Sequence, residues 1–387
     1  MRRIVILLSL ALAACATPPK APPKALPEAA SPAPDAAATA PARALDLPHR
    51  KVPVSIPAGS AAAALAAFRA SCPRITWRMD RSGLVLPSDW QAVCRDAETA
   101  TDPVAFFADN FEGVEIAGGD GFATGYFEPE IRASRTRAPG YQVPLFRRPA
   151  DLVEVDLGAF RQEWQGRTLR GRLDGRRLVP YYSRGAIQEG ALAGKGLELA
   201  FAADANDAFF LEIQGSGRLR LPDGEVMRIG YDSQNGRDYV PIGRVLVDMG
   251  ALPRDGVSMQ SIRAWLDANP DKADQVRNTN PSAVFFRELS GLDPDDGPRG
   301  ALNIPVRAQV SVAVDPAFIP YGTPLIATLD GQAPRLHVAM DTGGAIRGPG
   351  RLDIFQGTGK DAGEAAGKLA SKARVVLLLP RRASSRL

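Results

Sequence analysis

Short apolar runs dominate the hydrophobic pattern of the central part of the chain, residues 125–286, and Gly, Pro and Asp residues interrupt them. Residues 208–214, 217–224 and 226–231 are apolar or alternate between apolar and polar positions over the length of a strand. Such runs, bounded by turn-forming residues, are typical of β-strands. This part of the chain is therefore predicted to be mainly β.

The C-terminal part of the chain repeats this pattern, and no internal sequence repeat is visible. The folded part is predicted to begin near Val52. Further strands are predicted over residues 306–314, 324–329, 336–341, 352–355 and 375–379.

Helical signals are fewer. An amphipathic helix is predicted over residues 258–269, because Ser258 can cap its start and Pro270 can end it. A second helix is predicted over residues 361–371, where an Asp and a Glu three residues later form a variant capping box. Near the N-terminus, Ser60 precedes a run of Ala, Leu and Phe and is expected to cap a short helix.

The chain has 387 residues, which predicts two or three domains. With 45% apolar and 23% charged residues, it is neither wholly disordered nor collagen-like. Its net charge of +4 comes from 47 basic and 43 acidic residues without a dominant basic block, so no nucleic-acid partner is predicted. Two His and three Cys are too few for most metal sites. We therefore predict no metal site, structural zinc included.

The N-terminus predicts an exported lipoprotein. Two arginines precede an apolar run over residues 4–14, which is too short to span a membrane and indicates a signal peptide over residues 1–14. The Leu-Ala-Ala-Cys stretch that ends at Cys15 resembles the bacterial lipobox, so Cys15 is predicted to carry lipid. Ala16 follows, which favours an outer-membrane lipoprotein facing the periplasm. The alternative is an ordinary signal peptide that happens to contain a Cys.

The segment after Cys15 has the composition of a tether. Ala and Pro account for 21 of the 33 residues over 16–48, so residues 15–50 are predicted to link the lipid to the folded part, with a reach of roughly 100 Å. A disordered leader without a length requirement is the alternative. Cys72 and Cys94 are 22 residues apart in a chain predicted to be exported. They are predicted to form a disulfide, and two separate thiols remain the alternative.

The strongest candidate for chemistry is a stretch rich in Gly and carboxylates, residues 337–359. One strand would end at Asp341, a glycine loop would turn the chain, and a second strand would carry Asp353 into the same cleft. Alternation along that strand places Asp353 and Phe355 on one face. Two carboxylates in this arrangement indicate an acid/base site, although Asp next to Gly more often serves to cap a turn.

Other catalytic motifs are incomplete. The Asp341-Thr-Gly triplet is that of an aspartic protease, but the chain has no second copy of it. The Gln214-Gly-Ser-Gly stretch lacks the leading Gly of a nucleophile elbow. A phosphate-binding loop at Gly359-Lys360 would need Ser or Thr where Asp361 stands.

Separated motifs lie at residues 124–129, 214–217, 235–239 with 243–244, 280 with 284–286, 314–315 with 319–322, and 341–359. Together they resemble the membrane-bound lytic murein transglycosylase A family, with its C-terminal three-aspartate domain. One departure is Phe127, where a second Tyr is expected; the departure affects one sugar-stacking or hydroxyl contact.

The resemblance implies a mainly β fold in which a discontinuous double-psi β-barrel is formed by residues 51–127 and 288–380. A second β domain, residues 128–287, would be inserted between them, with a few short helices. Peptidoglycan glycan strands would lie in the groove between the two domains. The implied activity is cleavage of the bond between N-acetylmuramic acid and N-acetylglucosamine with formation of a 1,6-anhydro end, without a cofactor.

The resemblance also implies roles for single residues. Asp353 is expected to be the acid/base, Asp341 to support it, and Asp315 to be structural. A hydrolase of the same glycan and a non-catalytic wall-binding lipoprotein remain alternatives, and protein partners in a wall-remodelling complex are not identified. Substrate contacts are expected from Thr124, Gly125, Tyr126, Gln214, Gly215, Ser216, Gly343 and Gly344.

Overall fold

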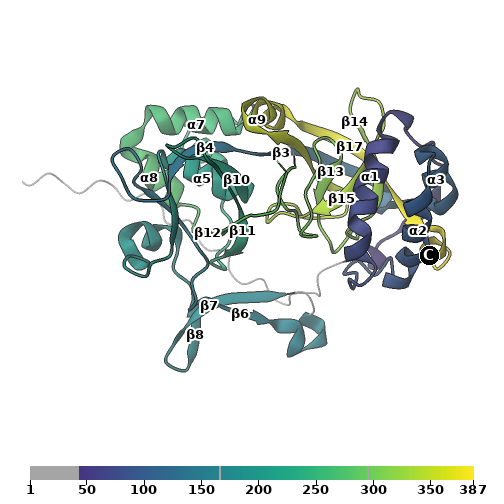
Figure 1. Ribbon diagram of the computed structural model, residues 1–387, viewed down its shortest axis with the longest axis horizontal. Helices are drawn as coiled ribbons and strands as arrows, with labels where there is room; N and C mark the ends of the chain where they lie inside the picture. Colours follow the sequence, from purple (N-terminus) through teal and green to yellow (C-terminus); the bar gives the residue numbers. More distant parts are fainter. Residues whose placement is uncertain (1–42, 165–166, 294–295) are drawn as a thin grey trace, which may run out of the picture. The chain divides into compact units, whose positions relative to one another are not determined.

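The computed structural model describes residues 43–164, 167–293 and 296–387 (Figure 1). The predicted signal peptide, the lipidated Cys15 and most of the predicted tether lie outside these residues. All described residues belong to one compact unit. Within the described part of the chain, no helix is long and apolar enough to cross a membrane.

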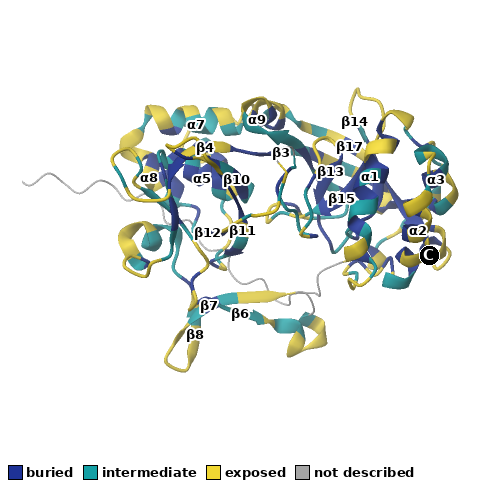
Figure 2. Ribbon diagram, viewed as in Figure 1, coloured by how far each residue is buried: buried dark blue, intermediate teal, exposed yellow. Residues whose placement is uncertain are grey.

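An eight-stranded sheet carries both candidate carboxylates. Its strand order is β1-β2-β17-β14-β15-β13-β16-β3, and an additional pairing of β17 with β3 closes a ring of six strands. The β13–β15 and β16–β3 pairs are parallel. Most residues of β13 and β15 are buried (Figure 2). The strands are β1 His49–Val52, β2 Phe111–Ile116, β3 Asp120–Glu128, β13 Ser311–Val314, β14 Pro324–Leu329, β15 Arg335–Asp341, β16 Arg351–Thr358 and β17 Ala370–Pro380.

Three helices, α1 Ala58–Ile75, α2 Pro87–Thr99 and α3 Pro103–Asn110, pack together beside this sheet. Their shared core is aromatic: Phe68 contacts Trp90 and Phe106 at ring-centroid distances of 6.0 and 5.8 Å. A disulfide joins Cys72 of α1 to Cys94 of α2, with Cα atoms 5.7 Å apart. The remaining helices of this part are α9 Gly359–Lys368, α10 Arg381–Ser384 and the 3-10 turns η1 Ala44–Asp46 and η2 Ala117–Gly119.

A second sheet is formed by the segment between β3 and β13. Its order is β12-β11-β10-β4-β9-β5, and its strands are β4 Glu130–Ser134, β5 Val143–Phe146, β9 Glu198–Ala202, β10 Ser216–Arg220, β11 Val226–Gln234 and β12 Val284–Glu288. The helical elements of the segment are α4 Arg184–Ala186, α5 Ala205–Gln214, α6 Ile242–Asp248, α7 Met259–Ala268, α8 Pro270–Asn278, the π-helical turn η5 Ile187–Ala191 and the 3-10 turns η3 Leu157–Ala159 and η4 Gln162–Trp164.

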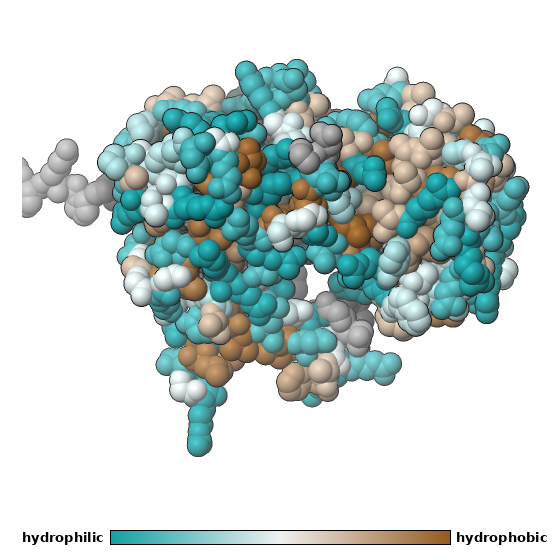
Figure 3. Space-filling model, viewed as in Figure 1, coloured by the Kyte–Doolittle hydropathy of each residue, from teal (hydrophilic) through white to brown (hydrophobic). Residues whose placement is uncertain are grey.

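The same segment contains a third sheet of three strands, β6 Val153–Asp156, β7 Thr168–Asp174 and β8 Arg177–Pro180. Leu173 and Leu178 are direct cross-strand partners and therefore lie on one face of this sheet. Both are exposed, as is Leu169. Figure 3 shows hydrophobic surface over β7 and β8.

The predicted mainly β fold with a few helices is confirmed, and so is the helix predicted over residues 258–269. Helix α7 begins after Ser258, whose side chain accepts a hydrogen bond from the backbone N–H of Ser261. Asn269 ends this helix, and Pro270 begins the next one. The predicted strands over residues 217–224, 226–231, 324–329, 336–341, 352–355 and 375–379 all contain or overlap observed strands.

The strand predicted over residues 208–214 is wrong, because these residues lie in helix α5. Asp204 caps this helix by accepting from the N–H of Asp207, and Gly215 ends it in the left-handed region with φ 76°. A short apolar run fits a buried helix as well as a strand, and the two caps decide between them. The strand predicted over residues 306–314 covers only Ser311–Val314.

Three predicted boundaries are also wrong. Helix α1 begins at Ala58, so Ser60 lies inside it and its hydroxyl instead accepts from the N–H of Leu336. Helix α9 begins at Gly359, without the predicted capping box, and ends at Lys368. Strand β1 begins at His49, which pairs with Ile116, so the folded part starts before the end of the predicted tether.

Candidate active site

Strand pairing brings the two candidate carboxylates together from distant parts of the chain. Ala313 of β13 is paired with Asp341 of β15 on one side and with Asp353 of β16 on the other. On the next strand of the ring, β3, Thr124 is paired with Asp353 and Tyr126 with Phe355. The ring therefore places two aspartates, a threonine and a tyrosine around one point.

Asp353 is held by a hydroxyl, and no ion pair among the described residues includes it. Thr124 Oγ1 donates to Asp353 Oδ1 at 2.6 Å, and the Thr124 oxygen itself accepts from Arg351 Nη2 at 2.8 Å. Burial raises the pKa of Asp353 to about 6, against the opposing effects of the Thr124 hydrogen bond and the Arg351 charge. The side chain keeps part of its surface open to solvent. Asp353 can therefore hold a proton near neutral pH and deliver it to a bound molecule.

Asp341 accepts more hydrogen bonds than Asp353. Tyr126 Oη donates to Asp341 Oδ2 at 3.0 Å, and the N–H groups of Ala301 and Thr342 donate to Oδ1 at 3.0 and 2.9 Å. Burial raises the pKa of Asp341 to about 6; the hydrogen bonds oppose this rise, and the charge of Asp353 adds to it. Because hydrogen bonds to a carboxylate favour its charged form, Asp341 is better suited than Asp353 to remain ionised.

Tyr126 links Asp341 to the aromatic ring of Phe355. Its ring lies 5.1 Å from the ring of Phe355, measured between centroids. Burial raises the pKa of Tyr126, and the neighbouring Asp341 raises it further, so its hydroxyl stays protonated and serves as a donor. Asp315 accepts from the N–H of Ala317 through Oδ1 and from the N–H of Gly348 through Oδ2, which ties the loop after β15 to β13.

The other predicted contact residues lie on two elements beside β3 and in the loop after β15. Gln214 ends α5, and its Oε1 accepts from the N–H of Phe127 at 3.2 Å. Gly215 and the buried Ser216 follow, at the start of β10. Gly343 and Gly344 follow β15, with Gly343 accepting from the N–H of Ile346.

Gly125 and Phe127 face helix α9. A Cβ atom at Gly125 would lie 2.8 Å from the Cα atom of Ala366, so β3 can approach the helix this closely only with glycine there. Phe127 is buried against Ala362 and Ala366. The Tyr-to-Phe departure at this position therefore removes a hydroxyl from the packing against α9.

Sequence reasoning missed a buried ionic cluster at the end of β3. Glu128 is fully buried; its Oε2 accepts from Arg218 Nε at 2.8 Å and its Oε1 from Arg228 Nη2 at 3.1 Å. Thr358 Oγ1 also donates to Glu128, at 2.9 Å. The cluster joins the strand ring to the second sheet. An available signal was Arg228, a charged residue within the apolar run at residues 226–231.

The described residues contain no group of three or more His, Cys, Asp and Glu side chains that could hold a metal ion. The paired aspartates can instead supply general acid and base chemistry in the same place. Their flanking aromatic rings and backbone N–H groups suit a polar ligand with an apolar face, such as a sugar.

Comparisons with known proteins agree with this geometry. Residues 122–287 match the model of the MltA specific insert domain, and residues 310–379 match the model of the 3D domain. The chain is 34% identical over 283 residues to membrane-bound lytic murein transglycosylase A of Escherichia coli strain K12, covering 70% of this chain and 67% of the relative. A Vibrio cholerae relative of the same name is 30% identical over 290 residues, covering 71% of this chain and 70% of the relative.

Solved structures show the same fold. A membrane-bound lytic murein transglycosylase from Agrobacterium tumefaciens superposes with a TM-score of 0.78 at 33% identity, covering 87% of this chain and 99% of that one. A structure of E. coli MltA with bound chitohexaose gives a TM-score of 0.64 at 30% identity, covering 86% and 94%. The chain belongs to the membrane-bound lytic murein transglycosylase A family. The resemblance predicted from its motifs is confirmed.

Proposed function

We propose that this protein is a lytic transglycosylase that cleaves the β-1,4 bond between N-acetylmuramic acid and N-acetylglucosamine in peptidoglycan. One observation carries the proposal: Asp353, with its pKa raised to about 6, is bonded to Thr124 and lies across β13 from Asp341. Such a carboxyl can act as an acid and then, after losing its proton, as a base.

In the first step Asp353 protonates the glycosidic oxygen, and the bond from that oxygen to C1 of the muramic acid breaks. In the second step the Asp353 carboxylate takes the proton of the C6 hydroxyl of the same sugar while that oxygen bonds to C1. The products are a free 4-hydroxyl and a 1,6-anhydro ring, and no water is consumed. Because the attacking hydroxyl belongs to the bound sugar, its proximity lowers the activation free energy by about 7 kcal/mol or more.

Asp341 is assigned the electrostatic role in this scheme. It accepts three hydrogen bonds, whereas Asp353 accepts one from the described residues, donated by Thr124. A negative charge beside C1 stabilises the oxocarbenium-like transition state. The different numbers of hydrogen-bond donors thus support different roles for two aspartates that have similar pKa values.

The glycan strand is proposed to lie in a groove between a double-psi β-barrel, residues 51–127 and 288–380, and the inserted domain, residues 128–287. The closed six-stranded ring with two parallel pairs supports the barrel. The E. coli relative with bound chitohexaose supports a sugar ligand. The proposed sugar contacts are Thr124, Gly125, Tyr126, Gln214, Gly215, Ser216, Gly343 and Gly344.

The protein is further proposed to be an outer-membrane lipoprotein that faces the periplasm, anchored by lipid on Cys15 and tethered by residues 15–50. The names of the relatives, which are membrane-bound, support a membrane location. Two or more acyl chains are needed for stable anchoring. A Cys15→Ala variant is expected to leave the membrane fraction, and its complete retention there would contradict the anchor.

Mass analysis of fragments released from purified sacculi tests the reaction. A transglycosylase releases muropeptides one water lighter than the hydrolysis products. Fragments that end mainly in reducing sugars would establish a hydrolase instead. Binding of sacculi without any released fragment would identify a wall-binding module.

A further inference from the structure

A cavity of about 270 Å³ opens beside the strand ring, and neither Asp341 nor Asp353 lines it. It is lined by residues of β14, β15, β16 and α9. Ile354 lies in its wall, and its neighbour Asp353 projects from the opposite face of β16, because side chains alternate along a strand. His337 lines the cavity from β15, four residues before Asp341 on the same strand. The cavity is therefore separate from the candidate active site.

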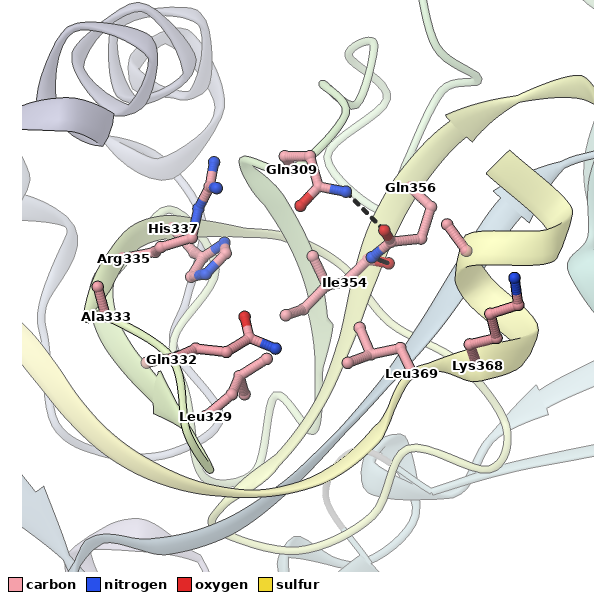
Figure 4. A pocket seen from close by; sticks show the side chains of 12 residues that line it. Gln309, Leu329, Gln332, Ala333, Arg335, His337, Ile354, Gln356, Lys368 and Leu369 are labelled. Atoms are coloured by element: carbon pink, nitrogen blue, oxygen red, sulfur yellow. Dashed lines mark hydrogen bonds between the residues drawn. The ribbon is translucent and has the colours of Figure 1, made fainter. Parts of the chain in front are cut away.

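The charges around the cavity are all positive. Arg335 and Lys368 lie on opposite sides of the opening (Figure 4). Among the described residues that line it, none is acidic. Neither cation forms an ion pair within the parts of the chain that the structure covers. Two cations without carboxylate partners favour an anionic group between them.

The wall contains an unpartnered polar atom. His337 is 2% exposed, and its Nδ1 has no hydrogen-bond partner among the described residues. Its ring points into the same opening as Gln332 and Ile354 (Figure 4). Burial lowers the pKa of His337 to about 4, so the ring is neutral near pH 7. A buried polar atom without a partner is costly, and a ligand that supplies a polar group would satisfy it.

The remaining lining matches a peptide in size and polarity. Gln332 presents a side-chain amide to the opening, and Gln309 bonds to Gln356 across its edge at 2.5 Å. Leu329, Ile354 and Leu369 form an apolar part of the wall that suits small alkyl groups. The volume is at the lower end of that of ligand pockets, which favours a ligand of about two residues.

We propose that this cavity binds the end of a short peptide that has small side chains and a free C-terminal carboxylate. The carboxylate would be attracted by the positive charges of Arg335 and Lys368, while peptide groups would meet Gln332 and the orphaned Nδ1 of His337. This binding is separate from glycan cleavage and does not depend on the mechanism proposed above.

Titration of the full chain with the dipeptide D-Ala-D-Ala tests the proposal. The chain has two histidines, His49 and His337, so the imidazole signals in a nuclear magnetic resonance spectrum are assigned with one His337→Gln spectrum. D-Ala-D-Ala is expected to move the His337 signals at saturation and leave those of His49 unchanged. The amidated dipeptide is expected to bind at least tenfold more weakly, and acetate likewise. Equal binding of the amidated dipeptide or of acetate, or no shift with D-Ala-D-Ala, would overturn the proposal.

Charge-removing variants locate the ligand. Arg335→Gln combined with Lys368→Gln is expected to weaken D-Ala-D-Ala binding at least tenfold, since both side chains are exposed and their loss leaves the core intact. Arg176→Gln combined with Arg177→Gln, which removes the same charge from the exposed β7–β8 turn, is the matched control and is expected to bind normally. Equal weakening in both pairs would attribute the effect to net charge and contradict the site.

Discussion

Buried or partly buried carboxylates occur in two regions of the molecule with opposite surroundings. Beside the N-terminal helices, Asp89 is bonded to Arg386, and Glu115 to Arg50 and Arg374. Burial pushes the pKa of Asp89 up, but hydrogen bonds from Arg386 and a backbone N–H outweigh it, so its pKa is lowered. The hydrogen bond from Arg50 likewise lowers the pKa of Glu115 against the effect of burial.

In the active site, no ion pair of the described residues includes Asp341 or Asp353. The nearby Arg351 donates to Thr124. Burial therefore dominates, and both pKa values rise to about 6. An arginine in direct contact thus turns a buried carboxylate into a structural anchor, whereas a hydroxyl in the same position leaves it able to carry a proton.

The largest expected effect comes from the active site. Asp353→Asn keeps the shape of the side chain and removes its proton, so the rate of fragment release from sacculi is expected to fall at least about 10³-fold. Glycan binding is expected to persist. In the wild type the rate is expected to fall as the pH rises above about 6, because Asp353 then loses its proton.

Two variants accompany this measurement. Asp341→Asn is expected to lose less activity, because it removes an electrostatic stabiliser and not the proton donor, and its amide oxygen can still accept from the N–H groups of Ala301 and Thr342. Asp330→Asn, an exposed aspartate in the turn after β14, is the matched control and is expected to retain the wild-type rate. Near-normal activity in Asp353→Asn would remove this residue from the mechanism.

The disulfide between helices α1 and α2 gives the next-largest expected effect, a loss of stability. Cys72 and Cys94 close a loop with a sequence separation of 22. Replacing both with Ala is expected to lower the free energy of unfolding by about 3 kcal/mol, chiefly because the unfolded chain then has more conformational entropy. Denaturant titration measures this loss. Thiol counting in the denatured wild type is expected to find no free thiol at these positions, and two free thiols would refute the bridge.

The stability of single-carboxylate variants is expected to depend on pH in opposite ways in the two regions. Asp89→Asn is expected to lose about 2 kcal/mol at pH 7, because it weakens the charge-assisted hydrogen bonds that buried Asp89 accepts from the exposed Arg386. The pKa of Asp89 is lowered, so its contribution exists above the unfolded value of 3.8 and disappears as the pH falls through the folded value. The deficit of Asp89→Asn is therefore expected to shrink on acidification.

Asp353→Asn is expected to behave in the opposite way. The pKa of Asp353 is raised from 3.8 to about 6, so the folded state binds this proton more tightly and its stabilisation is lost as the pH rises through 6. The melting temperature of Asp353→Asn relative to wild type is therefore expected to increase from pH 4 to pH 7. A parallel decline of both variants would show that the two regions do not differ.

The smallest effect is expected from Gln214. Its Oε1 is engaged by the N–H of Phe127, and its side-chain N–H groups remain for a sugar. Gln214→Ala is expected to raise the apparent KM by about tenfold, the value of one lost hydrogen bond, with little change in kcat. A collapse of kcat at unchanged KM would instead place Gln214 in the chemical step.

Local sequence patterns predicted much of the ring, because strands such as β14 and β15 are mostly apolar and bounded by turns. They also identified Asp341 and Asp353, through the glycine loop between them. The family motifs indicated Thr124 as a sugar contact, but its hydrogen bond to Asp353, 229 residues away, was not predicted, since no local pattern encodes strand register. The ionic cluster of Glu128 was missed for the same reason: its arginines lie on two strands of another sheet.

Closure of the ring has a kinetic consequence. Strand β3 pairs with β16 and β17, which are synthesised only after the whole intervening segment. Until then the edges of β3 have no partner within the ring, and long-range pairing of this kind is slow and prone to aggregation. We expect refolding from denaturant to be slow and strongly concentration-dependent in yield, and truncation before β17 to abolish the native state altogether.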